Sequence, residues 1–365
     1  EFSFKMEVGF SKDLSLFQLN DHPTPKSMFN KNYPFFTSSS KYMLKHFKQY
    51  SSWIKKNYSN NIKKIIEIGS NDGSFLRNFK SKKTNILGIE PSSNVANIAK
   101  KNGIKTINSF FSYKISKNLK QFIKETDIII AANVICHIPN LKDLIRGVDN
   151  LLSTKGLFIF EEPYLGSMFE KTSYDQIYDE HIFMFSVTSI NKIFNLYNFE
   201  LINVAPQKTH GGSMRYVIAR KGIYKVKKSV LKHLKYEDLK KINSIKGCFN
   251  FKKNCEKSKK KLKDKIKMIL KSGKNIAGYA ATSKSTTILN YCGINHKHID
   301  FICDTTKDKI GKFTPRTHIP IVNINHFHNN IPDYTFLFAW NHKKEIFNKE
   351  KKILNKTKWI AHINI

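Results

Sequence analysis

The sequence predicts an α/β protein in which two Rossmann-like units share one chain and are joined by helices. Over residues 61–221, short apolar stretches alternate with longer helical stretches, which is typical of a doubly wound sheet. Residues 224–272 are rich in lysine and carry apolar residues at helical spacing, which predicts helices. A new strand pattern begins at Asn275, and the α/β alternation then repeats to Ile365.

A chain of 365 residues is too long for one comfortable core, and its length indicates two or three domains. The composition, 40% hydrophobic and 13% aromatic, is that of a globular protein. The first part of the chain is irregular and aromatic, with an amphipathic helix expected from Ser40 to Lys56. The pattern divides the chain into the segments 1–58, 59–223, 224–272 and 273–365.

Short apolar runs bounded by turn residues predict the strands of both units. The predicted strands are Lys64–Ile68, Asn85–Glu90, Ile128–Asn133, Gly156–Glu161, the antiparallel pair Phe199–Ala205 and Gly212–Arg220, and, in the second unit, Asn275–Tyr279.

The net charge of +35 at first suggests a nucleic-acid partner. Of the 63 basic residues, however, only five are arginines, and the lysines are spread over the whole chain. Proteins that read nucleic acids favour arginine for bidentate contacts and gather basic residues on one patch. We therefore expect no nucleic-acid partner, but a general field that attracts a small anionic substrate.

The sequence carries no signal for a membrane or for an oxidising compartment. No run of about eighteen apolar residues predicts a membrane span, and residues 1–19 lack the apolar core of a signal peptide. The five cysteines include no Cys-x-x-Cys pair, so we expect neither disulfides nor a cysteine zinc site. The expected location is the cytoplasm.

The clearest local signal is the run of residues 65–76, in which a buried strand leads into a glycine-bearing turn and then a helix. Gly69 and Gly73 let the backbone bend sharply and approach a ligand closely, and a valine at position 69 is expected to occupy the ligand's path. The spacing Glu-x-Gly-x-x-x-Gly lacks the crowded amides that hold a pyrophosphate, so it favours a ligand with an amino-acid group. Glu90, which ends the second strand, is placed to accept hydrogen bonds from ribose hydroxyls.

The order and spacing of these features predict a class I methyltransferase that uses S-adenosylmethionine, although a single glycine turn is just as common as a structural element. Asn71 and Asp72 are expected to orient the ammonium and carboxylate groups of the cofactor. The strand that ends at Asn133 is expected to line its adenosyl and methyl end. The full set expected to bind the cofactor is Glu67, Gly69, Asn71, Asp72, Gly73, Glu90, Pro91, Asn133 and His137.

Several longer motifs are more specific than these single residues. They are EEPYLG at 161–166, YDQIYDEH at 174–181, AGYAATSK at 277–284, LNYCGI at 289–294, Asp304 followed by KIGK at 309–312, the run 315–320, and AWN at 339–341. Together they resemble the sugar C-methyltransferase family, whose members methylate C3 of nucleotide-linked 4-keto-deoxysugars. The resemblance covers nearly the whole chain and includes a second Rossmann-like domain that generic methyltransferases lack.

The resemblance implies a catalytic mechanism. A general base removes a proton beside a ketone, and the enolate carbon then attacks the sulfonium methyl. His181 matches the family's base, and an imidazole is suited to proton transfer near neutral pH. Tyr178 is expected to donate to the enolate oxygen and Glu180 to orient the imidazole. The alternative is that this polar run only caps a helix.

The resemblance also assigns the segment 273–365 to the nucleotide of the substrate, with 224–272 as the helical connector. Lys284 and Lys309 are expected at the diphosphate and Asp304 at the ribose or base. Ala280 and Ser285 replace glycines of the family pattern, which puts the phosphate geometry in doubt. The residues expected to bind substrate are Tyr33, His210, Lys284, Asn290, Asp304, Lys309 and Trp340. Two of these residues have an equally open alternative to substrate binding: aromatic packing alone for Tyr33, and a structural turn for His210.

The N-terminus departs from the family. Members begin with a small four-cysteine zinc domain, and residues 10–19 align with its second Cys-x-x-Cys, which leaves Ser11 and Leu14 in the ligand positions. Neither residue supplies a thiolate, so we expect no zinc and no other metal. Either this zinc-domain remnant, which with the lid helix forms segment 1–58, has decayed or the chain has lost its beginning.

We therefore expect a C-methyltransferase of nucleotide-linked keto-deoxysugars, in surface-polysaccharide or natural-product sugar biosynthesis. Three alternatives stay open: methylation at oxygen or of another small molecule, a non-catalytic relative that binds cofactor or sugar nucleotide, and a nucleic-acid methyltransferase, which would bind nucleic acid in a strongly salt-dependent way. A small nucleotide sugar is the expected partner. The oligomeric state is open, and the layout is compatible with a monomer.

Overall fold

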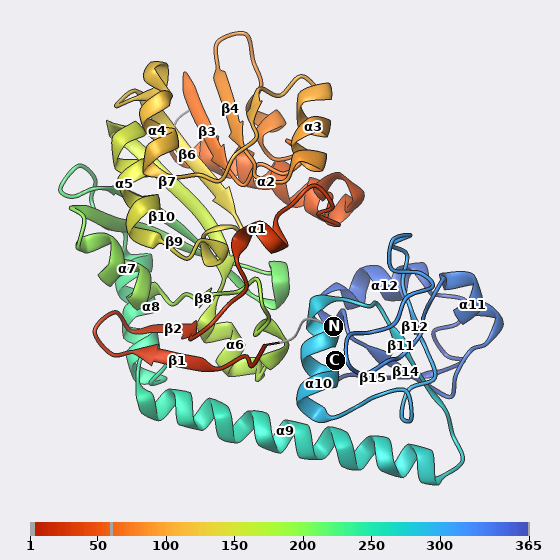
Figure 1. The fold of residues 1–365 in the computed structure, drawn as a ribbon. Helices are drawn as coiled ribbons and strands as arrows, with labels where there is room; N and C mark the ends of the chain where they lie inside the picture. The colour runs from red at the N-terminus through yellow and green to blue at the C-terminus, as the bar shows by residue number, and fades with distance from the viewer. Residues whose placement is uncertain (1–3, 59–60, 364–365) are drawn as a thin grey trace.

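The computed structural model describes residues 4–58 and 61–363, and it contains two α/β units connected by a long helix (Figure 1). A seven-stranded sheet forms the first unit, a five-stranded sheet forms the second, and a small three-stranded sheet lies beside the first. The predicted fold class, two Rossmann-like units joined by helices, is confirmed. The first domain boundary was predicted between residues 58 and 59. Residues 59 and 60 lie outside the described part of the chain.

The first sheet has the strand order β5-β4-β3-β6-β7-β10-β9 and is parallel except for β10, which is antiparallel to both of its neighbours. Because the sheet extends from β3 in both directions, through β4 and through β6, the carboxyl ends of β3 and β6 form a switch point, where such sheets bind ligands. The strands are β3 (Lys64–Ile68), β4 (Asn85–Ile89), β5 (Thr106–Ile107), β6 (Thr126–Ala132), β7 (Leu152–Pro163), β9 (Phe199–Gln207) and β10 (Ser213–Arg220).

The central strands form where the sequence is richest in β-branched apolar residues. Ile65 and Ile66 of β3, and Ile129 and Ile130 of β6, are fully buried. A parallel strand is covered by helices on both faces, so a continuous run of isoleucine stabilises it on either side. Each strand predicted for this unit overlaps a strand of the sheet, and the observed β6, β7 and β9 are longer than predicted.

Helices cover both faces of the first sheet, and short 3-10 turns join several of them to the strands (Figure 1). The predicted lid helix is α2, and the Ser40 hydroxyl caps it by accepting from the Met43 amide. The helices are α1 (Pro25–Met28), α2 (Lys41–Asn57), α3 (Ser93–Lys101), α4 (Tyr113–Asn118), α5 (Leu141–Leu151), α6 (Leu165–Lys171) and α7 (Val187–Asn195). The 3-10 turns are η1 (Thr37–Ser39), η2 (Leu76–Phe79), η3 (Lys120–Phe122), η4 (Ile135–His137), η5 (Tyr174–Gln176) and η6 (Thr209–Gly211).

The second unit is a fully parallel sheet in the order β13-β12-β11-β14-β15. Its strands are β11 (Ile276–Tyr279), β12 (Ile302–Cys303), β13 (Ile321–Val322), β14 (Tyr334–Leu337) and β15 (Lys358–Ile360). Its helices are α10 (Ser283–Cys292), α11 (Ile324–Asn329) and α12 (Lys343–Lys349), with the 3-10 turn η7 (Trp340–His342).

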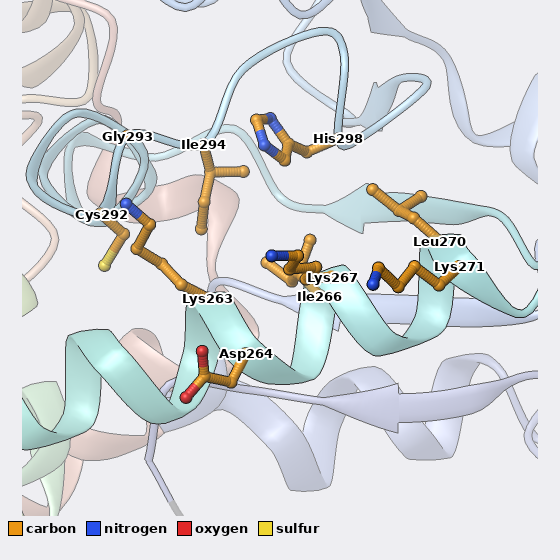
Figure 2. Close-up of a pocket in the computed structure, with 10 residues that line it drawn as sticks. All are labelled: Lys263, Asp264, Ile266, Lys267, Leu270, Lys271, Cys292, Gly293, Ile294 and His298. Atoms are coloured by element: carbon orange, nitrogen blue, oxygen red, sulfur yellow. The ribbon is translucent and has the colours of Figure 1, made fainter.

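Two helices connect the units, α8 (Lys228–Leu239) and the 27-residue α9 (Ile245–Lys271), which runs from beside the first unit to the second (Figure 1). The helix α9 is long, but its outer face is rich in lysine. Within residues 4–58 and 61–363, no helix is both long and apolar enough to span a membrane. A pocket of about 590 Å³ lies between α9 and the end of α10. Figure 2 shows its lining, in which Lys263 and Lys267 of α9 face Gly293 and His298. Its lining comes only from α9 and from the end of α10 and the loop after it, so it is separate from the switch point of the first sheet.

The N-terminal segment forms a hairpin, β1 (Val8–Ser11) and β2 (Leu16–Leu19), and β2 pairs with β8 (Phe183–Met184). Ser11 and Leu14, the residues in the predicted ligand positions, lie at the hairpin turn, where the Ser11 hydroxyl accepts from the Leu14 amide at 3.4 Å. Phe17 of β2 packs edge-to-face on Phe169. The hairpin is therefore fixed by strand pairing and apolar packing.

Candidate active site

A cavity of about 640 Å³ opens at the switch point of the first sheet. Its walls come from several parts of the chain: the turns after β3, β4 and β6 with the start of α5, Phe110 and Phe111 after β5, the lid segment 25–47, the loop 178–181, His210 of η6, and Thr282, Ser283, Thr306 and Lys309 of the second unit. The cavity therefore joins the predicted cofactor turn to the predicted base and to the second unit.

The turn after β3 depends on backbone conformations that most residues avoid. Gly69 has φ +68°, Asn71 φ +47° and Gly73 φ +76°. A Cβ atom added at Gly69 would lie 2.4 Å from Val134 Cγ2, so the turn after β6 also limits what fits at this position. Gly69 also lines the cavity, so the expectation that a side chain here would meet the cofactor stays a prediction.

The carboxylate of Glu90 fixes the turn after β3 by accepting hydrogen bonds from backbone amides. Its two oxygens accept from the backbone amides of Asn71 at 2.9 Å and Ser92 at 2.8 Å. Burial raises the pKa of Glu90, and these amide donors oppose the rise. Asn71, which donates to this carboxylate, and Pro91, which follows Glu90 in the sequence, also line the cavity.

The cavity wall also carries buried polar atoms without a partner in the described part of the chain. They include Glu67 Oε2, Ser70 Oγ and Asn133 Oδ1, each from a residue that lines the cavity. Buried polar atoms are normally hydrogen-bonded, so such a group points to a polar ligand. Hydroxyl, amide and carboxylate groups around a glycine turn fit the ribose and amino-acid ends of S-adenosylmethionine.

Asn71 and Asp72 hold the lid against this turn. Asn71 Oδ1 accepts from the Thr37 amide at 3.0 Å, and Asp72 Oδ2 accepts from the Ser38 amide at 2.8 Å. Asn71 still lines the cavity, whereas Asp72 is fully buried beneath it, with its other oxygen accepting from Ser74. The structure thus places Asp72 as an anchor of the lid.

Two adjacent glutamates of the 161–166 motif fix the neighbouring elements. Glu162 Oε1 accepts from the amides of Val134 and Ile135 at 3.0 and 2.7 Å, which holds the turn that carries His137. Glu161 Oε1 contacts His46 of α2 at 2.8 Å, and its Oε2 accepts from Arg215 of β10 at 2.9 Å. The motif therefore joins the lid helix and the β6 turn to the sheet.

His181 is held in one tautomer. Its Nδ1 lies 2.8 Å from the Gln176 carbonyl oxygen, and because a carbonyl only accepts, Nδ1 carries the proton. Nε2 then holds the lone pair and accepts from the Tyr178 hydroxyl at 2.6 Å. Burial, followed by the electrostatic effect of the neighbouring His137 imidazole, lowers the pKa of His181 well below its ordinary value. A neutral imidazole of this kind can act as a general base once the lone pair on Nε2 is released from the Tyr178 hydroxyl.

The rings around His181 form a stack. Its centroid lies 3.9 Å from that of Tyr178 and 5.4 Å from that of His137, and His137 in turn stacks on Phe29 of the lid segment at 5.5 Å. Burial lowers the pKa of His137 to about 4, so this ring too is neutral. Glu180 lines the cavity beside them, and burial, then the charge of Asp179, raises the pKa of its carboxyl to about 7.

Cys136, His137 and His181 place their ligand atoms within 4.8 Å of one another, the spacing of a metal site. One of the three is already engaged, because His181 Nε2 accepts from the Tyr178 hydroxyl, and Cys136 lies beside the Glu162 carboxylate. These contacts favour an active-site cluster over a metal centre.

The second unit presents a small-residue turn to the cavity. Lys309 Nζ donates to the Ala281 carbonyl at 2.7 Å, and Asp304 Oδ2 accepts from the Ala281 amide at 2.8 Å, which fixes the turn after β11 where Ala280 has φ +73°. Thr282 caps α10 there, so the start of this helix faces the cavity.

Lys284 lies in the first turn of α10, one residue beyond the cavity lining. Its Nζ is buried and has no hydrogen-bond partner in the described residues; the nearest carboxylate is that of Asp175, at 3.9 Å. Burial lowers the pKa of Lys284, and Asp175 opposes this.

The structure brings most of the predicted site residues to one cavity. Those that line it are Tyr33, Glu67, Gly69, Asn71, Glu90, Pro91, Asn133, His137, Tyr178, Glu180, His181, His210 and Lys309. Those outside its lining are Asp72, Gly73, Lys284, Asn290, Asp304 and Trp340.

Sequence reasoning missed Gln176, whose backbone carbonyl orients His181, the role predicted for Glu180. It also missed Phe29, which stacks on His137 from the lid. A carbonyl carries no side-chain signal, and a lone phenylalanine in an aromatic segment gives none. Ser70, inside the predicted turn, could have been found from its position.

Comparison with known proteins gives matches over both units. A family model described as a methyltransferase domain matches residues 42–204, and one described as a C-methyltransferase C-terminal domain matches residues 208–363. The chain is 30% identical over 291 residues to the C-methyltransferase NovU of Streptomyces niveus, which covers 80% of this chain and 69% of that protein.

Solved methyltransferases align with about half of the chain. The magnesium protoporphyrin IX methyltransferase of Synechocystis PCC 6803 with bound SAM is 13% identical, with a TM-score of 0.37, over 49% of this chain and 79% of that one. The plantazolicin methyltransferase BpumL in complex with SAH is 13% identical, with a TM-score of 0.38, over 48% and 82%.

Proposed function

The chain belongs to the sugar C-methyltransferase family, and we propose that it methylates C3 of a nucleotide-linked 4-keto-deoxysugar through an enolate. Family membership makes it a C-methyltransferase that uses S-adenosylmethionine. The observation that carries the finer proposal is the His181 imidazole, neutral and held in one tautomer, in a cavity shared by the cofactor turn and the second unit.

In this proposal the substrate's ketone enters beside Tyr178. The Tyr178 hydroxyl turns from His181 Nε2 to the ketone oxygen, and the freed lone pair accepts the proton from the adjacent carbon. Burial and the nearby Glu180 charge raise the pKa of Tyr178 well above its ordinary value, so the hydroxyl keeps its proton and stabilises the enolate oxygen by donation. The bound cofactor supplies an electrophilic methyl group to the enolate carbon.

The second unit is proposed to hold the nucleotide. Lys309 lines the cavity together with Thr282 and Ser283 at the start of α10 and with Thr306 in the loop after β12. Hydroxyls, an ammonium group and the amides of a helix start are the donors that bind phosphate groups. The overall charge of +35 favours the approach of such an anion.

The proposal is tested with His181→Asn in the full chain. We expect the affinity for S-adenosylmethionine, measured by titration calorimetry, to stay within about twofold, while turnover falls by about 100-fold or more, since general-base catalysis contributes that much. The substrate is chosen by a thermal-shift screen of TDP-, CDP-, GDP- and UDP-linked keto-sugars. A product with a methoxy resonance, or a His181→Asn enzyme with normal turnover, would refute the proposal.

A further inference from the structure

The loop that carries Tyr178 and His181 has little regular structure of its own. It follows the short turn η5 and continues to β8 without helix or strand between them. A catalytic group on such a loop is effective only if other elements fix its backbone, because an error of about 1 Å in position can cost about 100-fold in rate. What fixes this loop is therefore part of the mechanism.

Asp175, in the middle of η5, is fully buried and bonds only to residues of the second unit among those the structure describes. Its Oδ2 accepts from Trp340 Nε1 at 2.8 Å, and its Oδ1 lies 3.0 Å from His362 Nε2. Lys284 Nζ is 3.9 Å from Oδ2. One carboxylate of the first unit is thus held by three side chains of the second.

The same short stretch touches the base. Gln176, the residue after Asp175, provides the carbonyl that accepts from His181 Nδ1, and the next carbonyl, that of Ile177, accepts from Thr287 Oγ1 of α10 at 2.8 Å. Any displacement of Asp175 is therefore passed through one peptide unit to the group that sets the His181 tautomer.

Electrostatic attraction strengthens the contact between Asp175 and the second unit. Burial alone would raise the pKa of Asp175, but His362 and Lys284 outweigh it and hold the pKa below its ordinary value, so the group is a carboxylate. If the groups that donate hydrogen bonds to a buried carboxylate are removed, the desolvation penalty of the carboxylate is no longer offset. The arrangement therefore favours a docked second unit and a fixed η5.

We propose that Asp175 is a positioning residue, through which the second unit fixes the Gln176 carbonyl and with it the orientation and tautomer of His181. Asp175 does not line the cavity, so it acts through the base and not on the substrate. The proposal rests on the function proposed for His181, and it adds that the nucleotide-binding unit also aligns the base.

The test is Asp175→Asn in the full chain labelled with ¹⁵N-histidine. The ring nitrogens of His181 are assigned by their absence from His181→Asn. In the parent we expect one form, protonated at Nδ1; in Asp175→Asn we expect a mixture of tautomers. With the tightest-binding sugar of the thermal-shift screen, kcat should fall by about 100-fold, while the affinity for S-adenosylmethionine is unchanged.

Two variants on the other side of the contact guard against simple misfolding. His362→Gln and Trp340→Phe each remove one donor, and each should shift the His181 ring signals in the same direction as Asp175→Asn. The double variant Asp175→Asn/His362→Gln should lose less activity than the two single losses multiplied, since both break one contact. Thr335→Val is the control, because it removes a buried 2.9 Å hydrogen bond to Thr357 inside the second unit only.

Unchanged His181 ring signals in Asp175→Asn would overturn the positioning role, as would a loss of kcat no greater than in Thr335→Val. The two proposals fail in different ways. If His181→Asn turns over normally, the base is wrong; if His181→Asn is inactive while Asp175→Asn keeps the parental tautomer and kcat, only the positioning role is wrong.

Discussion

Replacing Gly69 by alanine tests how the cofactor turn is built. The new Cβ would meet Val134 Cγ2 and Cγ1 at 2.4 and 2.8 Å, and the backbone has φ +68°. The left-handed conformation costs an L-residue about 1–2 kcal/mol, and forcing a methyl group into a filled space costs about 1–3 kcal/mol more. Gly69→Ala should therefore lower the free energy of unfolding by about 2–5 kcal/mol, a large part of the about 5–15 kcal/mol of a typical protein.

Gly222→Ala separates the two costs. Gly222 has a similar φ of +79°, but a Cβ added there would meet nothing within 4 Å. We expect Gly222→Ala to show only the backbone cost of about 1–2 kcal/mol. Val134→Ala combined with Gly69→Ala should relieve the contact, so the pair should be less destabilised than the sum of the single variants.

Urea unfolding gives the free energies of the four variants Gly69→Ala, Gly222→Ala, Val134→Ala and Gly69→Ala/Val134→Ala, and titration calorimetry gives their affinity for S-adenosylmethionine. The affinity should fall in Gly69→Ala, because moving Val134 also moves Asn133, whose side chain faces the cavity. The reasoning is refuted if Gly69→Ala is no more destabilising than Gly222→Ala, or if Val134→Ala fails to relieve it.

Three further outcomes are expected. Burial, and then the charge of Asp179, raises the pKa of Glu180 in the folded protein to about 7. The contribution of this carboxyl to stability is therefore full below its unfolded pKa and is lost as the pH rises from about 4.5 to 7. In melting experiments the Tm of Glu180→Gln should match that of the parent at pH 4 and exceed it above pH 7. Lys309→Ala should weaken nucleotide-sugar binding about tenfold, the effect of one lost charged hydrogen bond, and leave cofactor affinity unchanged, whereas the exposed Lys307→Ala should alter neither; equal calorimetric effects of both would contradict the phosphate role. Asp72→Asn should leave turnover chemistry intact but speed the amide hydrogen exchange of Ser38, since a neutral amide accepts a weaker hydrogen bond; unchanged exchange there would show that Asp72 does not hold the lid.

The sheet of the first unit could be predicted because its signal is local. A run such as Ile65 and Ile66 followed by Gly69 fixes a buried strand and a sharp turn from neighbours in sequence alone. The longer strands β7 and β9 extend beyond their predicted ends, because pairing with β6 and β10 continues past the apolar runs. Propensity defines where a strand exists better than where it ends.

The candidate site divides along the same line. Motif and spacing predicted Glu90 and His181 at one site by their own side chains, and both line the same cavity. The Gln176 carbonyl and the Trp340 contact to Asp175 depend on how two distant units dock, so no local pattern encodes them. Trp340 and Lys284 were expected at the substrate, and the structure instead places them at the contact between the units.

The loop that carries His181 is held at both ends by parts of the chain that are remote in sequence. At one end Asp175 is bonded by the second unit, and at the other the Ile182 carbonyl accepts from the Leu19 amide of the N-terminal hairpin at 2.8 Å. Phe17 of that hairpin belongs to an apolar core that also contains Tyr174 of η5 and residues of the second unit. The hairpin and the second unit thus pack into one core around the loop, and a disturbance of either should reach His181. If the loop carries the proposed proton transfer, the rigidity that it lacks locally is supplied by tertiary contacts on both sides.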